Sequence, residues 1–335
     1  MPILPTRSTN KDFHKFIICE IIKIMKILEN IKLDQFTSFK IGGVARYFVE
    51  LSSKEDLEKF LEWKQKVNLP VFVLGGGTNI LADDFRGIIL KPKFEHIERI
   101  EETKLVVGSG VLVSDLLNKV IEFSLKGLEW AGGLPGTVGG AIEGGVGCFG
   151  GEFKNLVFKV KTLNLENGNI ENFKNEECMF EYRNSIFRKE RKWLIIEATL
   201  EFVSYPFKDE LKKIAQEKIN YRKEKHPLDY PNAGSIFKNI PFEKAPKVVQ
   251  NLALEKNKVK NDPFKLIPIG FLIAEAGLVG KRIGDAQVSQ KHANFIVNLG
   301  KASFSDVYNL IEYIKKTIED KFSISPELEI QIIKC

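Results

Sequence analysis

The stretch GGLPGTVGGAIEGGVGCFGG, residues 132–151, constrains the fold of this chain more than any other feature. Ten of its twenty residues are glycine, far more than a turn between two elements requires. Glycine has no Cβ atom, so the backbone can adopt positive φ angles and another group can approach it closely. The stretch therefore predicts that something packs directly against this bare backbone.

A second glycine loop, LGGGTN at 74–79, follows an expected buried strand that begins at residue 71. It lacks the third glycine and the following helix of a dinucleotide fingerprint. GLVGKRIG at 277–284 fails as a P-loop, because Arg282 replaces Ser or Thr and Glu275 replaces glycine. A plain turn between strands remains possible for the GGG segment. Two such loops together favour backbone N–H groups that bind a pyrophosphate, helped by Thr78 and Asn79, and a surface beneath a planar cofactor.

Composition excludes several classes of protein. The 335 residues are 44% hydrophobic and 28% charged, as in a globular protein of two or three domains. The net charge of +6 includes no basic stripe, so no nucleic-acid partner is expected. Four cysteines and four histidines are scattered without CxxC or HExxH, which indicates a reducing cytoplasm and no metal site.

The first residues have little pattern, and no apolar run reaches the ~20 residues of a membrane span. Residues 16–28 come closest, but charged residues interrupt them. Met25 begins a segment that resembles a natural start, so residues 1–24 are interpreted as an extension or an upstream start. An amphipathic surface helix is the alternative.

The order of elements predicts an α+β protein. Residues 31–92 have a strand–helix–strand pattern, with Ser52 and Glu55 as the capping box of the helix. Short strands dominate residues 93–204, apart from one helix that Ser114 caps and that ends before Gly127. After Pro206 the expected elements are helices at 208–225 and 271–280, a helix at 306–322 capped by Ser303 and Asp306, and a strand at 327–333.

Several polar segments lie in the second half of the chain. YRNSIF, 182–187, is taken alone as an edge strand with a solvated Arg183. PNAGSIFKN, 231–239, places Ser235 after a tight turn, where a hydroxyl suits phosphate binding or proton transfer. It does not suit a nucleophile, because no GxSxG motif is present. His292 is interpreted as a structural histidine. Alternation in ELEIQII places Glu327 and Glu329 on one solvated face.

Seven segments in the same order resemble one family, UDP-N-acetylenolpyruvoylglucosamine reductase (MurB), a flavoenzyme of peptidoglycan precursor synthesis. The resemblance covers about residues 31–333 and matches the shorter form of the family, without an inserted tyrosine-bearing loop. The segments are TSFKIGG (37–43), LGGGTNIL (74–81), GLPGTVGGA (133–141), YRNSIF (182–187), PNAGSIFKN (231–239), GLVGKRIGDAQVSQKHANFIVN (277–298) and ELEIQII (327–333).

The resemblance implies a noncovalent FAD-binding domain of the vanillyl-alcohol-oxidase (PCMH) type in two subdomains. These are residues 31–92, and residues 93–205 with 321–335. A substrate-binding domain at 206–320 and an N-terminal extension at 1–30 complete the expected organisation. The implied cofactor contacts are Ile41, Gly42, Gly43, Gly75, Gly76, Gly77, Thr78, Asn79, Leu81, Pro135, Gly136, Thr137, Gly139 and Gly140.

The resemblance also implies the reaction. NADPH reduces the flavin, and UDP-N-acetylglucosamine enolpyruvate then takes the hydride. Ser235 would give the proton, while Arg183 and Glu329 stabilise the enolic intermediate, so the pKa of Glu329 is expected to be raised. The implied substrate contacts are Arg222, Lys225, Lys238 and Asn239. A cytoplasmic monomer is expected.

Two departures from the family pattern concern the site. Gly145 stands where the family has an asparagine, whose hydrogen bond is missing or replaced, with Glu143 as a candidate. Gln331 stands where the family has an arginine. Two rival functions remain open. One is another FAD-dependent oxidoreductase on the same flavin fold, and the other is a non-enzymatic nucleotide-binding protein.

Overall fold

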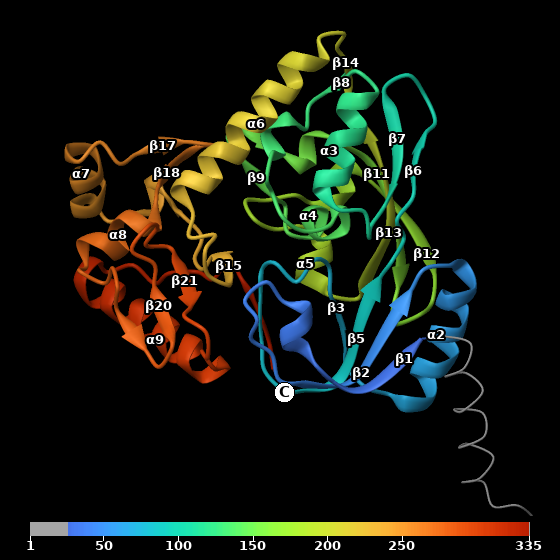
Figure 1. Cartoon of the computed structure of the whole chain (residues 1–335), viewed down its shortest axis with the longest axis horizontal. Helices are drawn as coiled ribbons and strands as arrows, with labels where there is room; N and C mark the ends of the chain where they lie inside the picture. The colour runs from blue at the N-terminus through green and yellow to red at the C-terminus, as the bar shows by residue number, and fades with distance from the viewer. Residues whose placement is uncertain (1–25, 335) are drawn as a thin grey trace, which may run out of the picture.

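The computed structural model describes residues 26–334, which form three groups of elements (Figure 1). The first group is a four-stranded sheet in the order β1–β2–β5–β3, in which only the β1–β2 pair is antiparallel. Its strands are β1 (Ile27–Lys32), β2 (Val44–Leu51), β3 (Val71–Val73) and β5 (Phe85–Pro92). Residues 27–30 therefore belong to this sheet and not to an extension. The expectations for residues 1–24 and for a start at Met25 lie outside the described residues.

Helix α2 (Lys54–Val67) packs on this sheet at its predicted position, but its cap is one residue later than predicted. Ser53 Oγ accepts a hydrogen bond from the Asp56 N–H at 3.1 Å, and the Asp56 carboxylate accepts one from the Ser53 N–H. The pair Ser52 and Glu55 is thus not the capping box. Both serines have an acidic residue three positions later, so spacing alone could not separate them. Strand β3, predicted as buried, is half-buried.

The second group is a five-stranded antiparallel sheet in the order β12–β11–β13–β7–β6. Its strands are β6 (Ile97–Arg99), β7 (Lys104–Gly108), β11 (Val157–Asn164), β12 (Ile170–Lys174) and β13 (Trp193–Glu201). Strands β11 and β12 form an antiparallel hairpin, and the Asn-Gly pair typical of hairpin turns lies between them at 167–168. Helix α3 (Val113–Glu122) shares a buried apolar core with this sheet.

Both predicted ends of α3 are wrong. Leu112 is the N-cap and makes no side-chain cap, so Ser114 lies inside the helix. The helix ends at Glu122, and Ser124 adopts the left-handed φ of +58° that is more typical of glycine. Gly127 lies beyond this turn. Tertiary packing of the apolar face, rather than the capping residues, determines the ends of this helix.

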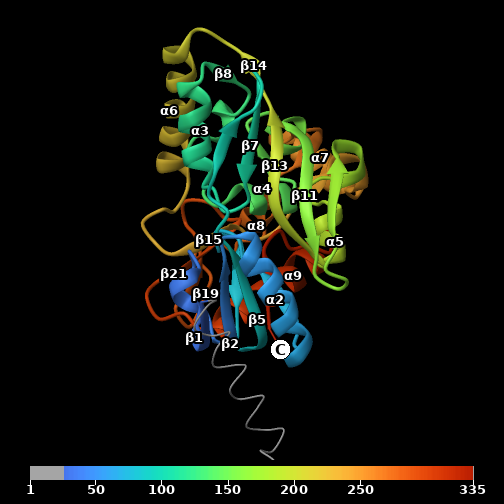
Figure 2. The ribbon, with the colours of Figure 1, turned by 90° about the vertical axis from the view of Figure 1, so that its right-hand side faces the viewer.

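Helix α6 (Lys208–Lys225) has its predicted bounds and lies beside α3 (Figures 1 and 2). Its buried Leu211 and Ala215 belong to the same core as α3 and the second sheet. A Cβ atom at Gly132 would lie 2.2 Å from the Ala215 carbonyl oxygen, so helix and glycine stretch are in direct contact. The composition change at residue 206 therefore marks a helix that packs on the preceding elements. The domain boundary there stays a prediction.

The third group contains two small antiparallel sheets and three helices, coloured orange to red in Figure 1. The sheets are β15 (Asn232–Ser235), β21 (Phe295–Asn298), β20 (Ala286–Val288) and β19 (Arg282–Ile283), then β16 (Ile240–Pro241), β18 (Lys265–Ile267) and β17 (Lys260–Asn261). The helices are α7 (Lys247–Glu255), α8 (Ile269–Glu275) and α9 (Phe304–Phe322). The capping box of Ser303 and Asp306 on α9 is confirmed. Helix α7 was not predicted; it buries Val249 and Ala253 on one face and leaves Val248 and Leu254 exposed.

The end of the described chain returns to the first sheet's glycine loop. Strand β22 (Gln331–Ile333) pairs in parallel with β4 (Ile80–Ala82). The predicted strand at 327–333 is therefore too long, because the backbone bends at residues 329 and 330. The expected common face is also wrong, since the Glu327 side chain is 77% exposed and that of Glu329 only 22%.

The predicted α+β class is confirmed by this mixture of sheets and helices. The remaining strands and helices are β8 (Leu125–Lys126), β9 (Gly147–Cys148), β10 (Gly151–Glu152), β14 (Val203–Ser204), α4 (Val138–Glu143) and α5 (Ile186–Glu190). Among residues 26–334, no helix has the length and apolar character needed to cross a membrane. The same residues contain no cluster of three or more His, Cys, Asp or Glu side chains suited to a metal ion.

Candidate active site

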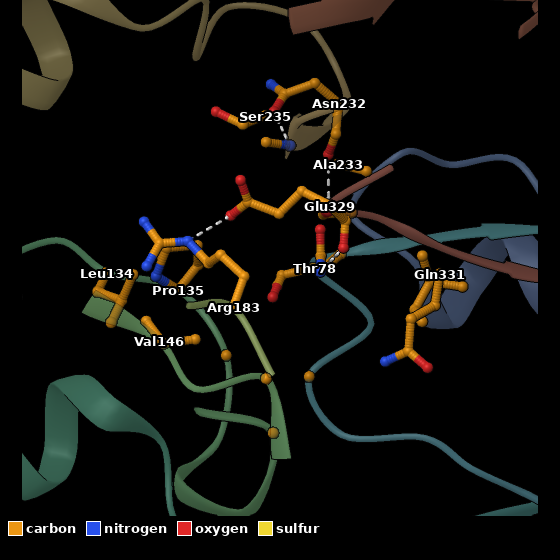
Figure 3. A pocket seen from close by; sticks show the side chains of 18 of the residues that line it. Thr78, Leu134, Pro135, Val146, Arg183, Asn232, Ala233, Ser235, Glu329 and Gln331 are labelled. Carbon is orange, nitrogen blue, oxygen red and sulfur yellow. Dashed lines mark hydrogen bonds and ion pairs between the residues drawn. The ribbon is translucent and has the colours of Figure 1, made fainter. Parts of the chain in front are cut away.

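A cavity of about 1450 Å³ is lined by residues from all three groups of elements (Figure 3). Both glycine loops, the turn at Arg183, strand β15 and the terminal segment from Glu329 to Lys334 contribute to its wall. Pockets for one small ligand usually measure about 300–1,000 Å³. This cavity therefore has room for a large cofactor and a second molecule.

The first glycine loop, residues 75–77, contacts the second one directly. A Cβ atom at Gly76 would lie 2.6 Å from the Cα atom of Gly136. Gly77 has a φ of +68°, and a Cβ atom there would lie 1.9 Å from the Phe36 carbonyl oxygen. These glycines are required because backbone approaches backbone. The two loops form one continuous part of the cavity wall.

Contacts with other parts of the chain explain several of the glycines in residues 132–151. A Cβ atom at Gly145 would lie 2.6 Å from the Asn184 carbonyl oxygen, and one at Gly151 would lie 2.2 Å from the Trp130 ring. Gly140 differs, because its nearest such contact is 3.5 Å away and it lines the cavity. A close ligand is therefore a reason for glycine at only some positions of this stretch.

A short helix inside the glycine stretch was not predicted. Thr137 is its N-cap, and Thr137 Oγ1 accepts a hydrogen bond from the Gly140 N–H at 3.3 Å. Glycine is among the poorest helix formers, so the sequence pattern does not indicate α4. Packing fixes it instead, since Val138 and Ile142 are fully buried in the core under the second sheet.

Arg183 and Glu329 form an ion pair on the cavity wall. Arg183 Nε donates to Glu329 Oε1 at 3.0 Å, and Figure 3 shows the Glu329 side chain extending toward Arg183. Arg183 has a φ of +57° in a turn between Glu181 and Asn184, so the edge strand expected here is wrong. Ser185 caps the short helix α5 directly after this turn. The turn directs Arg183 inward, and only 16% of its side chain is exposed.

The predicted increase in the pKa of Glu329 is confirmed. Burial raises this pKa, and the positive charges of Arg183 and Arg188 oppose the increase without cancelling it. The Glu329 carbonyl oxygen accepts hydrogen bonds from Asn79 Nδ2 at 3.0 Å and from Arg188 Nη2 at 2.6 Å. Because burial outweighs the neighbouring charges, the Glu329 carboxyl group takes up a proton more readily than an ordinary glutamate.

Ser235 is the last residue of β15 and lines the same cavity. The pairing of β15 with β21 is irregular between Asn232 and Ser235, and Gly234 has a φ of +77°. Such irregularities re-aim side chains at the edge of a sheet. Figure 3 shows Ser235 and Glu329 on the same side of the cavity wall, and the Glu329 N–H donates to the Ile236 carbonyl at 2.8 Å.

The structure brings most of the predicted cofactor residues to the cavity. The ones that line it are Gly75, Gly76, Gly77, Thr78, Asn79, Pro135, Gly136, Thr137, Gly139 and Gly140. Ile41 and Leu81 lie in an apolar core instead, and side chains at Gly42 or Gly43 would collide with neighbouring backbone. These four residues are not among those that line the cavity.

The four predicted substrate residues divide into two pairs. Arg222 and Asn239 line the cavity, and Arg222 Nη2 donates to Cys148 Sγ at 3.0 Å. Lys225 and Lys238 are not among the lining residues. Lys225 pairs with its neighbour Glu224, and Lys238 pairs with Glu327, both near the surface.

Sequence reasoning missed several residues of the wall. Arg188, Lys258, Lys260 and Lys291 line the cavity. Their signal is weak, because isolated cations in charged segments usually belong to solvated surfaces. The structural interpretation of His292 agrees with its Nδ1 accepting a hydrogen bond from the Asn294 N–H at 3.3 Å.

The half-buried His226 and the buried Ser109 were also missed. Burial, aided by Arg222, lowers the pKa of the cavity-lining His226 to about 4, so this imidazole is neutral at pH 7. Ser109 is 1% exposed, and its hydroxyl has no hydrogen-bond partner among residues 26–334. Buried hydroxyl groups without partners are rare. Because Ser109 also lines the cavity, its missing partner is expected to come from a ligand.

Comparison with known sequences gives two family matches within this chain. Residues 226–333 match the family described as "UDP-N-acetylenolpyruvoylglucosamine reductase, C-terminal domain", and residues 45–174 match the family "FAD binding domain". The chain is 39% identical over 318 residues to the UDP-N-acetylenolpyruvoylglucosamine reductase of Caldanaerobacter subterraneus subsp. tengcongensis, covering 94% of this chain and 96% of the relative. It is 38% identical to that of Anoxybacillus flavithermus, covering 92% and 94%.

Comparison with solved structures gives the same family. The crystal structure of UDP-N-acetylenolpyruvylglucosamine reductase from Thermus caldophilus matches with a TM-score of 0.72 and 27% identity. The match covers 92% of this chain and 100% of the other. The predicted fold class, with an FAD-binding domain before a reductase-specific C-terminal part, is therefore confirmed. The chain belongs to the UDP-N-acetylenolpyruvoylglucosamine reductase family.

Proposed function

We propose that the chain reduces UDP-N-acetylglucosamine enolpyruvate to UDP-N-acetylmuramate, with FAD as its bound cofactor and NADPH as the reductant. One observation carries this proposal. Arg183, Ser235 and Glu329 are far apart in the sequence, yet all three line one cavity together with both glycine loops. This combination joins a dinucleotide-sized site to a group of proton-holding and charge-stabilising side chains.

The residues present fit FAD. The cavity is large enough for a dinucleotide, and the Ser109 hydroxyl lacks a protein partner among residues 26–334. The open position at Gly140 leaves bare backbone facing the cavity. Thr78 and Asn79 follow the first glycine loop, where a pyrophosphate would find hydrogen-bond donors. The cofactor would lie along the two loops without a covalent link to the chain.

The proposed reaction adds a hydride to the terminal carbon of the enolpyruvyl group and a proton to the neighbouring carbon. FAD, when bound, takes the hydride from NADPH and supplies it to this substrate. Hydride addition leaves negative charge that spreads into the substrate carboxylate, which needs positioned donors in a dry site. Arg183 would stabilise this charge, Glu329 would hold a proton nearby because its pKa is raised, and Ser235 would donate the proton to carbon.

Substrate binding is proposed for the part of the cavity wall that α6, which carries Arg222, forms with the third group of elements, which carries Asn239. Arg222 and Asn239 would contact the substrate, with Lys225 and Lys238 as further candidates near the surface. The substrate-binding domain is proposed at 206–320, with α6 as its connection to the FAD-binding part at 31–205 and 321–335. A monomer in the cytoplasm, where its nucleotide substrates occur, completes the proposal.

Spectroscopy of the purified protein tests the proposal directly. The protein should bind FAD and show flavin absorbance, which NADPH should bleach in the absence of oxygen. UDP-N-acetylglucosamine enolpyruvate should restore the oxidised spectrum, whereas simple alcohols should not reduce the flavin. A protein that stays colourless after FAD is added would contradict the proposal. A reduced flavin that the enolpyruvyl substrate cannot reoxidise would contradict it as well.

A further inference from the structure

We infer that Glu143 and Gln331 are a positioning pair that ties helix α4 to the terminal segment and thereby fixes Glu329 in the cavity. Both residues line the cavity, and the inference assigns them to positioning Glu329 rather than to contact with the substrate. The inference rests on the proposed function, because it assigns Glu329 to the reduction of the enolpyruvyl group. It adds two residues through which that glutamate is placed.

The two side chains are joined by a direct hydrogen bond. Gln331 Nε2 lies 3.2 Å from each of the two carboxylate oxygens of Glu143. Both positions belong to the segments in which the chain departs from its family pattern. Gly145 cannot carry the missing family side chain here, because a Cβ atom would lie 2.6 Å from the Asn184 carbonyl oxygen. Glu143, two residues before Gly145, bonds to Gln331, so one of the two departures takes part in this contact.

The contact links the parts of the chain that place Glu329. Glu143 ends α4, the helix that starts in the second glycine loop. Gln331 begins β22, and its N–H donates to the Asn79 carbonyl at 2.9 Å. Asn79 in turn donates from Nδ2 to the Glu329 carbonyl at 3.0 Å. The terminal segment is therefore held on one side by the first glycine loop and on the other by α4.

The backbone bend makes this hold important for Glu329. The chain bends at residues 329 and 330, so the β-ladder of β22 with β4 begins only at Gln331. In Figure 3 the side chains of Glu329 and Gln331 leave the terminal segment in different directions, with Glu329 extending toward Arg183. The Glu143 contact thus anchors the first ladder residue after the bend. Loss of this anchor would let the bend, and the carboxyl group on it, shift.

The charged groups around Glu143 support a fixed geometry. Arg188 and Arg191, at the end of α5, are the cations that face it, and Ser185 Oγ donates to the Glu143 carbonyl at 2.7 Å. Arg188 also donates to the Glu329 carbonyl at 2.6 Å. One cation therefore lies between the two carboxyl-bearing residues. A displacement of either glutamate would alter the surroundings of the other.

The test exchanges the two side chains. Q331E places two carboxyl groups opposite each other and removes the amide donor. Flavin reoxidation by UDP-N-acetylglucosamine enolpyruvate should therefore slow about tenfold or more, which is within the range of interaction energies for residues in contact. Flavin reduction by NADPH should slow less. The double variant E143Q/Q331E restores a donor opposite a carboxylate with the wild-type net charge, and it should recover most of the rate. Q331A provides the same test without carboxylate repulsion if Q331E does not fold.

A control variant and the wild-type protein keep the outcomes distinct. Q216E makes the same chemical change on the exposed face of α6, where Gln216 bonds to Asn220 at 2.9 Å, and both half-reactions should keep wild-type rates. The inference is overturned if Q331E and Q331A reoxidise as fast as wild type. It is also overturned if the double variant fails to recover, or if both half-reactions fall equally. Failure of the wild-type protein to be reoxidised by the substrate would refute the proposed function instead.

Discussion

Gly76→Ala tests whether glycine is needed at residue 76 because the two glycine loops pack against each other or because a ligand lies against it. The new Cβ atom would lie 2.6 Å from the Gly136 Cα atom, whereas ordinary contacts begin at 3.4 Å. The loops would therefore have to separate by about 0.8 Å, the difference between these distances. Residue 136 approaches residue 76 with its backbone, which cannot rotate away as a side chain can. The cost should fall in the overpacking range of about 1–3 kcal/mol.

Gly140→Ala is the matched control. Its Cβ atom would lie 3.5 Å from Thr137 Oγ1, an ordinary contact, and residue 140 lies inside helix α4. Alanine is favoured over glycine within a helix by about 0.8–1.0 kcal/mol. The apoprotein should therefore be as stable as wild type or more stable. The added methyl group should nevertheless weaken FAD binding, because it occupies space that we assign to the cofactor.

Thermal denaturation of the apoprotein and titration with FAD separate the two effects. Gly76→Ala should lower the Tm of the apoprotein, by ~2–4 °C for each kcal/mol in a domain of 150–250 residues. Gly140→Ala should leave the apoprotein Tm unchanged or higher while raising the Kd for FAD. An apoprotein with Gly76→Ala that melts like wild type would refute the contact between the loops. Unchanged FAD affinity with Gly140→Ala would refute the cofactor position.

Three further predictions follow from the cited contacts. The raised pKa of Glu329 keeps its carboxyl group protonated above the usual pH range of a glutamate, so the rate of flavin reoxidation should fall as the pH rises through that pKa. Glu329→Gln should remove this fall from the pH–rate profile, and a wild-type profile without the fall would contradict the role of Glu329. In urea denaturation, Ser53→Ala should lower the free energy of unfolding by about 1 kcal/mol because Ser53 caps α2, whereas Ser114→Ala should lower it by less than about 0.5 kcal/mol. Equal losses for the two variants would contradict the assignment of Ser53 as the cap. Phe153→Ala removes a fully buried ring and should cost about 3–5 kcal/mol in the same assay, and a loss below about 1 kcal/mol would contradict its place in the core.

Local patterns predicted elements whose signals are contained within one segment. Helix α6 and the capping box of Ser303 and Asp306 are both confirmed, because amphipathic spacing and cap residues act over a few positions. Elements whose ends depend on distant contacts were predicted less well. The start of α3 follows the packing of its apolar face rather than Ser114. The short helix α4 lies in a glycine-rich stretch and is held by burial.

Prediction of the site was limited in the same way, by contacts between residues distant in sequence. The resemblance to the family selected Arg183, Ser235 and Glu329, and the structure brings all three to one cavity. The glycine stretch suggested a close ligand, but contacts such as Gly145 with Asn184 come from the fold itself. No local pattern could show these contacts, because the partners are distant in sequence. The same holds for the bond between Glu143 and Gln331, which only the folded chain reveals.

The two half-reactions of Ser235→Ala test the central claim most directly. Stopped-flow absorbance would measure flavin reduction by NADPH and, separately, reoxidation of the reduced flavin by UDP-N-acetylglucosamine enolpyruvate. Reduction should stay close to the wild-type rate, since Ser235 is assigned only to proton donation. Reoxidation should slow by about 10²–10⁴-fold, the usual contribution of a positioned general acid. Equal losses in both half-reactions, or unchanged reoxidation, would contradict the assignment of the proton to Ser235.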